Sequence, residues 1–252
     1  MKKRPNPQII LALDVDTLES AKNFINRLYP KIKIFKVGSH LFTAYGPKII
    51  ELLNKRCAQV FLDLKYFDIP NTVANAVAAA CRLKVKMLTL HITGGPQMIT
   101  AAVDAANRYG KKNRPLLLGI TVLTSQPATV QRVLSLAKQG LEYGLDGVVC
   151  SVKEAAFLRK KINRDFFIVT PGIRPNDCAA DDQKRTASVR QALVAGSDFL
   201  VIGRPILKAQ DPVKKAEEFL GDLSLFREGQ DKTAHRDVAK KYVGGVPYGR
   251  RN

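Results

Sequence analysis

Short apolar runs rich in β-branched and aromatic residues recur along most of the chain. Most are apolar at consecutive positions, which is typical of strands covered on both faces. The runs that predict strands are residues 9–14, 32–38, 59–65, 86–92, 115–121, 146–151, 166–172 and 198–203. Their number and their separation by longer segments indicate a parallel sheet with crossover connections.

The segments between most of these runs have apolar residues at helical spacing. Residues 72–84 are an example, with a single apolar stripe formed by Val73, Val77, Ala80 and Cys81. The same pattern is found in residues 20–28, 100–110 and 129–144. The last of these ends in Gly144, as helices often do.

Strands that alternate with helices in this way predict an α/β fold, a (β/α)8 TIM barrel formed by residues 1–220. A doubly wound open sheet is the alternative. That fold calls for a glycine-rich turn after the first strand, whereas this chain continues as LALDVDTLES. The barrel is therefore the favoured architecture.

The two ends of the chain differ from the barrel pattern. Residues 221–252 lose the apolar periodicity and are expected to form a basic C-terminal extension, solvated or packed on the surface, with a weak nucleic-acid or partner contact as the lesser alternative. At the other end, the apolar stretch Ile9 to Leu13 is too short for a signal peptide. No apolar run approaches the roughly 20 residues of a membrane span. We expect a cytoplasmic protein without membrane contact.

Composition adds one unusual quantity, the net charge of +19 from 41 basic and 22 acidic residues. Such a charge raises the possibility of nucleic-acid binding. The basic residues are spread over the chain, however, and no run interleaves them with aromatic residues that could stack on bases. Nucleic acid is therefore not the expected partner. A basic surface also attracts small anionic substrates, and that steering would weaken as ionic strength rises.

The cysteines are Cys57, Cys81, Cys150 and Cys178. They are far apart, form no CxxC pair and have no neighbouring histidine, so a zinc site or a disulfide framework is not expected. Free thiols in a reducing compartment are the simpler interpretation.

Charged residues gather where the predicted strands end, which is where (β/α)8 enzymes carry their active sites. The first strand ends in Asp14, the second in Lys36, and the third in Asp63 and Lys65. Period-two geometry places Asp63 and Lys65 on one side of their strand, about 6.5–7 Å apart. Leu62 and Leu64 then face the helices. The later strands end near His91, Thr121 and Thr124.

Asp68 lies in the loop after the third strand and does not follow this alternation, so it could point across a subunit boundary or start the next helix. Salt bridges that only stiffen the barrel mouth are the structural alternative for the charged cluster as a whole. Buried ion pairs return about as much free energy as their desolvation costs, so several together indicate function. For His91 we expect a hydrogen-bonded structural role.

Two segments suit a phosphate group. DFLVIGRPI places Gly203 and Arg204 after the last strand, at the start of a short extra helix. TPGIRPNDCAADDQKRT, residues 170–186, is long for a loop between a strand and a helix and is expected to act as a lid. Arg174 and Gln183 could supply its hydrogen-bond donors.

In the same order along the chain, LALD, FKVG, LDLKYFDIPNT, LHITGG, TPGIR, DDQKRT and IGRP resemble the motifs of the orotidine 5′-phosphate decarboxylase family. The likeness spans residues 9 to about 206, and its most specific element is D-x-K-x-x-D-I-x-N-T. The resemblance implies a homodimer of (β/α)8 barrels with shared active sites, which makes UMP without metal or cofactor.

Carried over residue by residue, the resemblance implies specific roles. Lys65 would donate the proton, and Asp63 would face the substrate carboxylate. The expected substrate-binding residues are Asp14 and Lys36 at the ribose, Thr124 near the pyrimidine, Arg174, Gln183, Gly203 and Arg204 at the phosphate, and Asp68, Ile69 and Thr72 from the neighbouring subunit. Lys36 and Asp68 would also belong to the catalytic charge array. Carboxylates on both sides of Lys65 favour its ammonium form.

Two other functions compete with this one. 3-Keto-L-gulonate 6-phosphate decarboxylase and hexulose phosphate synthase share D-x-K-x-x-D but use Mg²⁺ and a glutamate at the end of the second strand. Here Lys36 takes that place, and an ammonium cannot replace an oxygen ligand. A basic RNA-binding protein without enzymatic activity is the second alternative. It predicts salt-sensitive RNA retention and no turnover.

Overall fold

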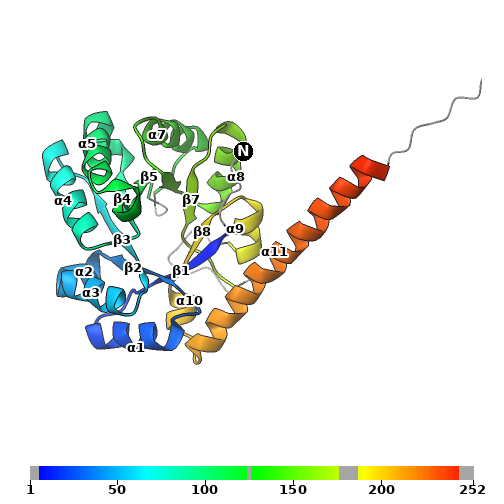
Figure 1. Cartoon of the computed structure of the whole chain (residues 1–252), viewed down its shortest axis with the longest axis horizontal. Helices are drawn as coiled ribbons and strands as arrows, with labels where there is room; N and C mark the ends of the chain where they lie inside the picture. The colour runs from blue at the N-terminus through cyan, green and yellow to red at the C-terminus, as the bar shows by residue number, and fades with distance from the viewer. Residues whose placement is uncertain (1–5, 124–125, 176–186, 244–252) are drawn as a thin grey trace, which may run out of the picture.

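The computed structural model describes residues 6–123, 126–175 and 187–243, with side chains as far as residue 228. Eight parallel strands form a closed barrel in which each strand pairs with the next and the eighth pairs with the first. Helices surround the barrel on its outside (Figure 1). The predicted (β/α)8 barrel is confirmed.

The first and last residue of each strand lie within two residues of the predicted ends. The strands are β1 Gln8–Ala12, β2 Ile34–Gly38, β3 Gln59–Tyr66, β4 Met87–His91, β5 Leu116–Ile120, β6 Gly147–Val149, β7 Phe167–Thr170 and β8 Phe199–Ile202.

The helices occupy the connections between them. Those of the first half are α1 Leu18–Leu28, α2 Ser39–Tyr45, α3 Pro47–Lys55, α4 Pro70–Arg82, the 3₁₀ helix η1 Ile92–Gly94, α5 Gly95–Asn107 and α6 Gly110–Asn113. The second half contains α7 Val130–Glu142, α8 Val152–Lys161, α9 Val189–Val194, α10 Arg204–Leu207 and α11 Pro212–Val243.

Local sequence explains where these helices start and stop. The Thr129 hydroxyl accepts a hydrogen bond from the Arg132 N–H at the start of α7. Gly144, just past its end, has a φ of 96°, which suits glycine. The apolar stripe predicted on α4 is the buried face of that helix. The short extra helix predicted after the last strand is α10.

The apolar core has two layers, separated by the barrel wall. The outer layer lies between strands and helices, and it includes Leu62 with Leu64 packed against it. The inner layer fills the barrel with alternate side chains of the strands: Ile10, Ala12, Ile34, Phe61, Met87, Leu118, Val169, Phe199 and Val201. On β1, β2 and β3 the next residues of the same parity are Asp14, Lys36 and Asp63. The inner apolar layer therefore forms the floor beneath the charged strand ends.

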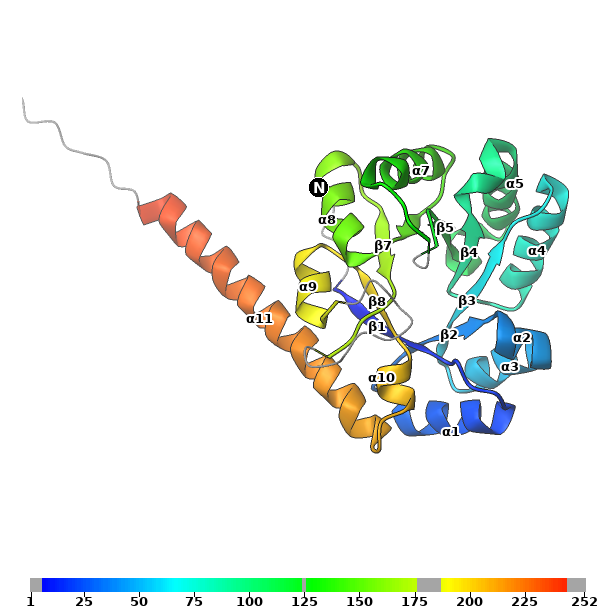
Figure 2. The same cartoon turned by 180° about the vertical axis from the view of Figure 1, so that it is seen from behind.

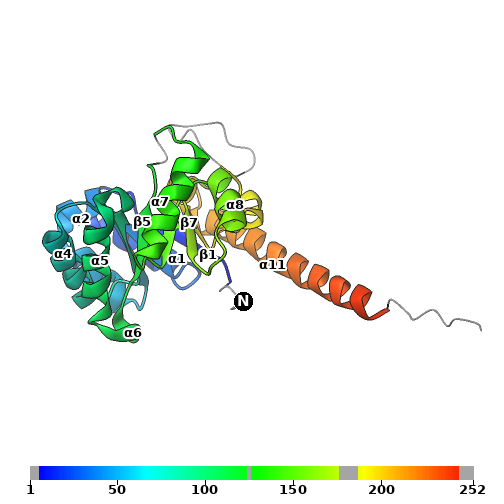
Figure 3. The same ribbon diagram turned by 90° about the horizontal axis from the view of Figure 1, so that it is seen from above.

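Helix α11 crosses the predicted boundary at residue 220 without a break and continues away from the barrel (Figure 1, Figure 2 and Figure 3). Leu223 is buried, Phe226 packs against the core, and Arg227 contacts the Pro7 carbonyl. The first turns after residue 220 thus pack on the barrel, which is one of the two arrangements expected for the extension. In the part of the chain that the structure covers, none of the helices is long and apolar enough to cross a bilayer.

The thiols Cys57, Cys81 and Cys150 are free, as expected. Burial raises the pKa of the Cys150 thiol, so this cysteine is unreactive. Cys178 lies outside the described residues.

Candidate active site

A cavity of about 560 Å³ opens at the carboxyl ends of the strands. Its floor is the inner apolar layer, represented by Ala12, Phe61, Val149, Val169 and Val201. Its walls carry the polar side chains of Asp14, Lys36, Asp63, Lys65, Arg174, Arg204 and Lys208. A volume of this size suits a small molecule that has both apolar and charged parts.

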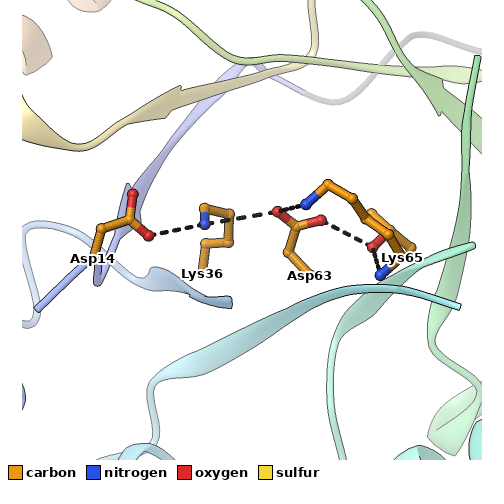
Figure 4. Close-up of polar contacts among 5 residues, drawn as sticks. Asp14, Lys36, Asp63 and Lys65 are labelled. Atoms are coloured by element: carbon orange, nitrogen blue, oxygen red, sulfur yellow. Dashed lines mark hydrogen bonds and ion pairs between the residues drawn. The ribbon is translucent and has the colours of Figure 1, made fainter. Parts of the chain in front are cut away.

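One wall is a row of alternating acids and bases, which we call the charged row: Asp14, Lys36, Asp63 and Lys65 (Figure 4). Lys36 Nζ lies 3.2 Å from Asp14 Oδ1 and 3.6 Å from Asp63 Oδ2. Lys65 Nζ lies 2.9 Å from the same Asp63 oxygen. The four predicted residues therefore do come together, on three neighbouring strands.

The third strand does not reach this arrangement by simple alternation. Its pairing with β4 shifts between Leu62, which faces Leu88, and Tyr66, which faces Leu90. Lys65 lies in this irregularity with a φ of 52°. Left-handed backbone at a residue with a Cβ costs about 1–2 kcal/mol. The strain occurs where the amine is turned toward Asp63, as is common at functional sites.

Asp63 is the most enclosed member of the charged row, with 9% of its surface exposed. Burial alone would raise the pKa of its carboxyl group. The Lys36 and Lys65 ammoniums, with hydrogen bonds from Lys65 and Thr89, outweigh burial and lower the pKa below its usual value. The carboxylate is thus held as an anion inside the cavity.

Thr89, on the neighbouring β4, was missed in the sequence. Its hydroxyl lies 2.9 Å from Asp63 Oδ1 and accepts a 3.0 Å hydrogen bond from the Lys65 backbone N–H. Its parity could have identified it: Met87 belongs to the inner layer, so Thr89, two residues later on the same strand, is a polar residue that also faces inward. A buried polar side chain in such a layer needs a partner.

Two glycines let backbone approach the charged row. A Cβ on Gly38 would lie 3.3 Å from Lys36 Nζ. A Cβ on Gly203 would lie 3.3 Å from the Ala12 Cβ and 3.5 Å from Asp14 Oδ2. Both contacts are tight, so larger side chains would displace the charged groups or their support.

The wall formed after β7 and β8 is cationic. Arg174 follows β7, is buried, and its backbone N–H donates to the Ala187 carbonyl at 2.9 Å. This bond and the bridge between Ile173 and Ala187 join the two ends of the long loop after β7. Arg204 begins α10, and Lys208 follows it. Lys208 was not predicted. Together the three side chains make this wall attractive to an anion.

The residues after β3 lie outside the cavity on the rim. Asp68 is exposed, and its Oδ1 accepts a hydrogen bond of 2.6 Å from the Ile69 N–H, so within this chain it does not extend the charged row. Ile69 and Phe67 are 65% and 63% exposed, and Thr72 is exposed as well. These apolar side chains at the rim are accessible to a second molecule.

His91 lies beside the cavity. Its ring packs edge-on against Phe67, with centroids 5.6 Å apart. Burial, followed by the nearby Lys65 ammonium, lowers the pKa of the imidazole. The packing agrees with the structural role expected for this residue, although the partner is a ring instead of a hydrogen-bonding group.

Two predicted site residues, Thr124 and Gln183, lie outside the described residues, as does most of the predicted lid. Within the described ranges, no three His, Cys, Asp or Glu side chains gather into a possible metal site. The two carboxylates of the charged row, Asp14 and Asp63, are separated by the Lys36 ammonium.

Comparisons with known proteins agree on one family. The profile of the orotidine 5'-phosphate decarboxylase / HUMPS family matches residues 7–219. Orotidine 5'-phosphate decarboxylase of Coxiella burnetii (strain RSA 331 / Henzerling II) is 45% identical over 235 residues, covering 88% of this chain and 98% of the relative. The enzyme of that name from Trichlorobacter lovleyi is 45% identical over 228 residues, covering 86% and 95%.

A solved structure shows the same likeness in three dimensions. The crystal structure of orotidine 5'-phosphate decarboxylase from Lactobacillus acidophilus superimposes with a TM-score of 0.76 at 36% identity, covering 88% of this chain and 99% of that one. A family profile over most of the barrel, and relatives matched over nearly their whole length, leave one conclusion. This chain belongs to the orotidine 5'-phosphate decarboxylase / HUMPS family.

Proposed function

We propose that this chain converts orotidine 5′-phosphate to UMP and CO₂ in pyrimidine biosynthesis, by direct decarboxylation without a metal, with Lys65 as the proton donor. The observation that carries the proposal is the charged row, in which the Lys65 amine lies 2.9 Å from the Asp63 carboxylate at the wall of the cavity. The names of the relatives point to the same reaction. We expect it to take place in the cytoplasm.

The reaction creates a localised charge. The bond between C6 and the carboxyl carbon breaks, CO₂ leaves, and the electron pair stays on C6 in the plane of the ring, where no π system spreads it. An ammonium already fixed beside C6 stabilises that charge as it develops. Lys65 then gives an Nζ proton to C6, and solvent restores the proton to the amine.

Asp63 contributes in two ways. As an anion beside the substrate carboxylate, it disfavours the ground state relative to a transition state in which that charge has moved to C6. It also orients Lys65 through their ion pair. Because Asp63 Oδ2 also faces Lys36 at 3.6 Å, the carboxylate bridges two ammoniums and keeps them from repelling each other.

Binding is divided between the two walls. Asp14 and Lys36 suit ribose hydroxyls because both are at the mouth of β1 and β2 and can accept or donate hydrogen bonds. Arg174 and Arg204, with the Gly203 backbone and Gln183, are assigned to the 5′-phosphate, and Thr124 to the pyrimidine. These contacts are far from the broken bond, so their binding energy can close a lid and exclude water.

A second subunit is proposed to complete the site. Asp68 and Thr72 are exposed on the rim, next to the exposed apolar side chains of Phe67 and Ile69. A homodimer that buries this rim would place Asp68, Ile69 and Thr72 at the neighbouring cavity. We keep residues 1–220 as the catalytic barrel and 221–252 as an extension, with the first turns of that extension packed on the barrel.

The Mg²⁺-dependent relatives are the competing function within the wider family. In them the end of the second strand supplies an oxygen ligand. Here the Lys36 ammonium lies between Asp14 and Asp63, where it would repel a divalent cation. This observation favours the metal-free reaction.

The test is the loss of orotidylate absorbance in the presence of EDTA, measured for the wild type, Lys65→Ala and Lys138→Ala. Lys138 is an exposed lysine on α7, so its variant is a matched control. We expect turnover by the wild type and the control with EDTA present, and an almost complete loss in Lys65→Ala. Turnover that requires added Mg²⁺, or that survives in Lys65→Ala, would refute the proposal.

A further inference from the structure

The Thr89 hydroxyl is the one group among the described residues that hydrogen-bonds to both Asp63 and Lys65 from another strand. It is 2.9 Å from Asp63 Oδ1 and 3.0 Å from the Lys65 backbone nitrogen. Only 1% of Thr89 is exposed, so water does not compete for these bonds. The two bonds tie strand β4 to the charged row.

The directions of the two bonds follow from the hydrogen count. A hydroxyl has a single proton, and the Lys65 N–H can only donate. The hydroxyl therefore accepts from Lys65 and gives its own proton to the Asp63 carboxylate. Both groups are satisfied by one side chain, and neither bond can be reversed.

The bond to Asp63 sets the rotation of its carboxylate. Oδ1 is bound to Thr89, while Oδ2 receives the Lys65 ammonium at 2.9 Å and faces the Lys36 ammonium at 3.6 Å. With its two oxygens assigned to different partners, the carboxylate cannot turn without losing bonds. Thr89 therefore keeps the oxygen Oδ2 directed at both lysines.

The bond to Lys65 replaces a missing strand contact. The pairing of β3 with β4 is irregular between Leu62 and Tyr66, so the Lys65 N–H lies outside the regular ladder. The Thr89 side chain accepts from that N–H instead. The left-handed backbone of Lys65, with a φ of 52°, is thus fixed from the neighbouring strand.

We propose that Thr89 is a positioning residue for the decarboxylation, which holds the Asp63 carboxylate and the Lys65 backbone in the arrangement that aims the Lys65 amine. The inference rests on the proposed function. A residue that served only to fill space could be valine, which has the shape of threonine without the hydroxyl. The inner layer below Thr89 is apolar, so a hydroxyl at this position is explained by its two bonds.

The test compares Thr89→Val with Thr89→Ser and with Ser197→Ala as a matched control. Ser197 is also buried and bonded through its hydroxyl, to Thr170, and it precedes β8, away from the strand ends that carry the charged row. In Thr89→Val we expect kcat to fall roughly 10- to 100-fold with a smaller change in KM, because the two lost hydrogen bonds hold Asp63 and Lys65 and not the substrate. Thr89→Ser should restore most of kcat, and Ser197→Ala should leave it near the wild-type value.

The pH profile separates positioning from simple destabilisation. Burial alone would raise the pKa of Asp63, but the two lysines and the hydrogen bonds, that of Thr89 among them, lower this pKa below its ordinary value. Without the hydroxyl this pKa rises, so the acid limb of kcat/KM should move to higher pH in Thr89→Val alone. An unshifted limb with wild-type kcat, or Thr89→Ser as impaired as Thr89→Val, would overturn the inference.

A further variant and a titration without substrate also test the positioning role of Thr89. If Thr89→Val does not fold, Thr89→Cys takes its place, since a thiol is a weaker donor than a hydroxyl, and kcat should then lie below that of Thr89→Ser. Equal kcat values would contradict the proposal. The carbon-13 resonance of the Asp63 carboxyl group reports its titration without any substrate. A titration midpoint of Asp63 that moves to higher pH in Thr89→Val would support the Thr89 contact. If the wild type nevertheless failed to decarboxylate orotidylate, the proposed function would be rejected and the contact would stand.

Discussion

The amine of Lys65 lies 2.9 Å from the carboxylate of Asp63, two residues earlier on the same strand, and both lie where the regular pairing with β4 is interrupted between Leu62 and Tyr66. A regular strand would leave their backbones about 6.5–7 Å apart with parallel side chains. In the observed conformation the Lys65 backbone is left-handed and its side chain turns back to Asp63. Strand β3 thus presents a preformed ion pair to the cavity.

Replacing Asp63 with asparagine should reduce kcat on the order of 100- to 1,000-fold, comparable with removal of one preorganised electrostatic group from other active sites. KM should change far less, because the variant loses repulsion of the substrate carboxylate as well as support for Lys65. Steady-state kinetics measure both constants. A variant with normal kcat and a raised KM would mean that Asp63 only binds substrate.

The free energy of unfolding should fall at acid pH, in part because the Asp63 carboxylate becomes protonated. The folded pKa of this carboxyl group lies below its ordinary value of 3.8, despite burial, because of the Lys36 and Lys65 charges. Its contribution to the free energy of unfolding is therefore present above about pH 4 and lost as the pH falls toward the folded pKa. Urea unfolding at several pH values should show a shallower acid decline in Asp63→Asn than in the wild type. Equal slopes would contradict this.

Removing the Arg204 guanidinium should lower kcat/KM for orotidine 5′-phosphate by roughly 100-fold or more, as expected for the loss of a charge-assisted phosphate contact. The same variant should treat the nucleoside orotidine as the wild type does, because that substrate has no phosphate. Arg190→Ala, which changes an exposed arginine on α9, is the control. Equal losses for both substrates would place Arg204 elsewhere in the mechanism.

Mixing two inactive variants tests the shared site. After subunit exchange, Lys65→Ala with Asp68→Ala should recover about a quarter of wild-type activity, because half of the dimers are mixed and each has one intact site. Lys65→Ala with Asp63→Ala is the matched control and should recover none, since both residues are contributed by the same subunit. No recovery in the first mixture, with exchange shown by native mass spectrometry, would place Asp68 in its own subunit's site.

The fold and the members of the charged row could be predicted because they depend on local patterns. Consecutive apolar positions identified the strands, and the parity that buries Ala12 and Phe61 also directs Asp14 and Asp63 inward. The irregular pairing of β3 could not be predicted, since it depends on contacts with β4. Thr89 and Lys208 were missed for a similar reason: their places in the site arise from tertiary packing and not from a short motif.

The packing of the residues after 220 could be predicted only in outline. Leu223 and Phe226 are apolar positions within a mostly polar stretch, and their burial depends on the course of α11 along the barrel. Local periodicity weakens there because only part of one helix face is covered. The sequence therefore left open whether this segment is solvated or packed on the surface, and in the structure its first turns are packed.

The most direct measurement is a crystal structure of the protein with UMP bound. Proton delivery by Lys65 predicts its Nζ in the plane of the pyrimidine, about 3–3.5 Å from C6, with Asp63 still paired to it. A structure in which C6 faces water or another side chain, while the Lys65 amine points away from the ring, would contradict the account.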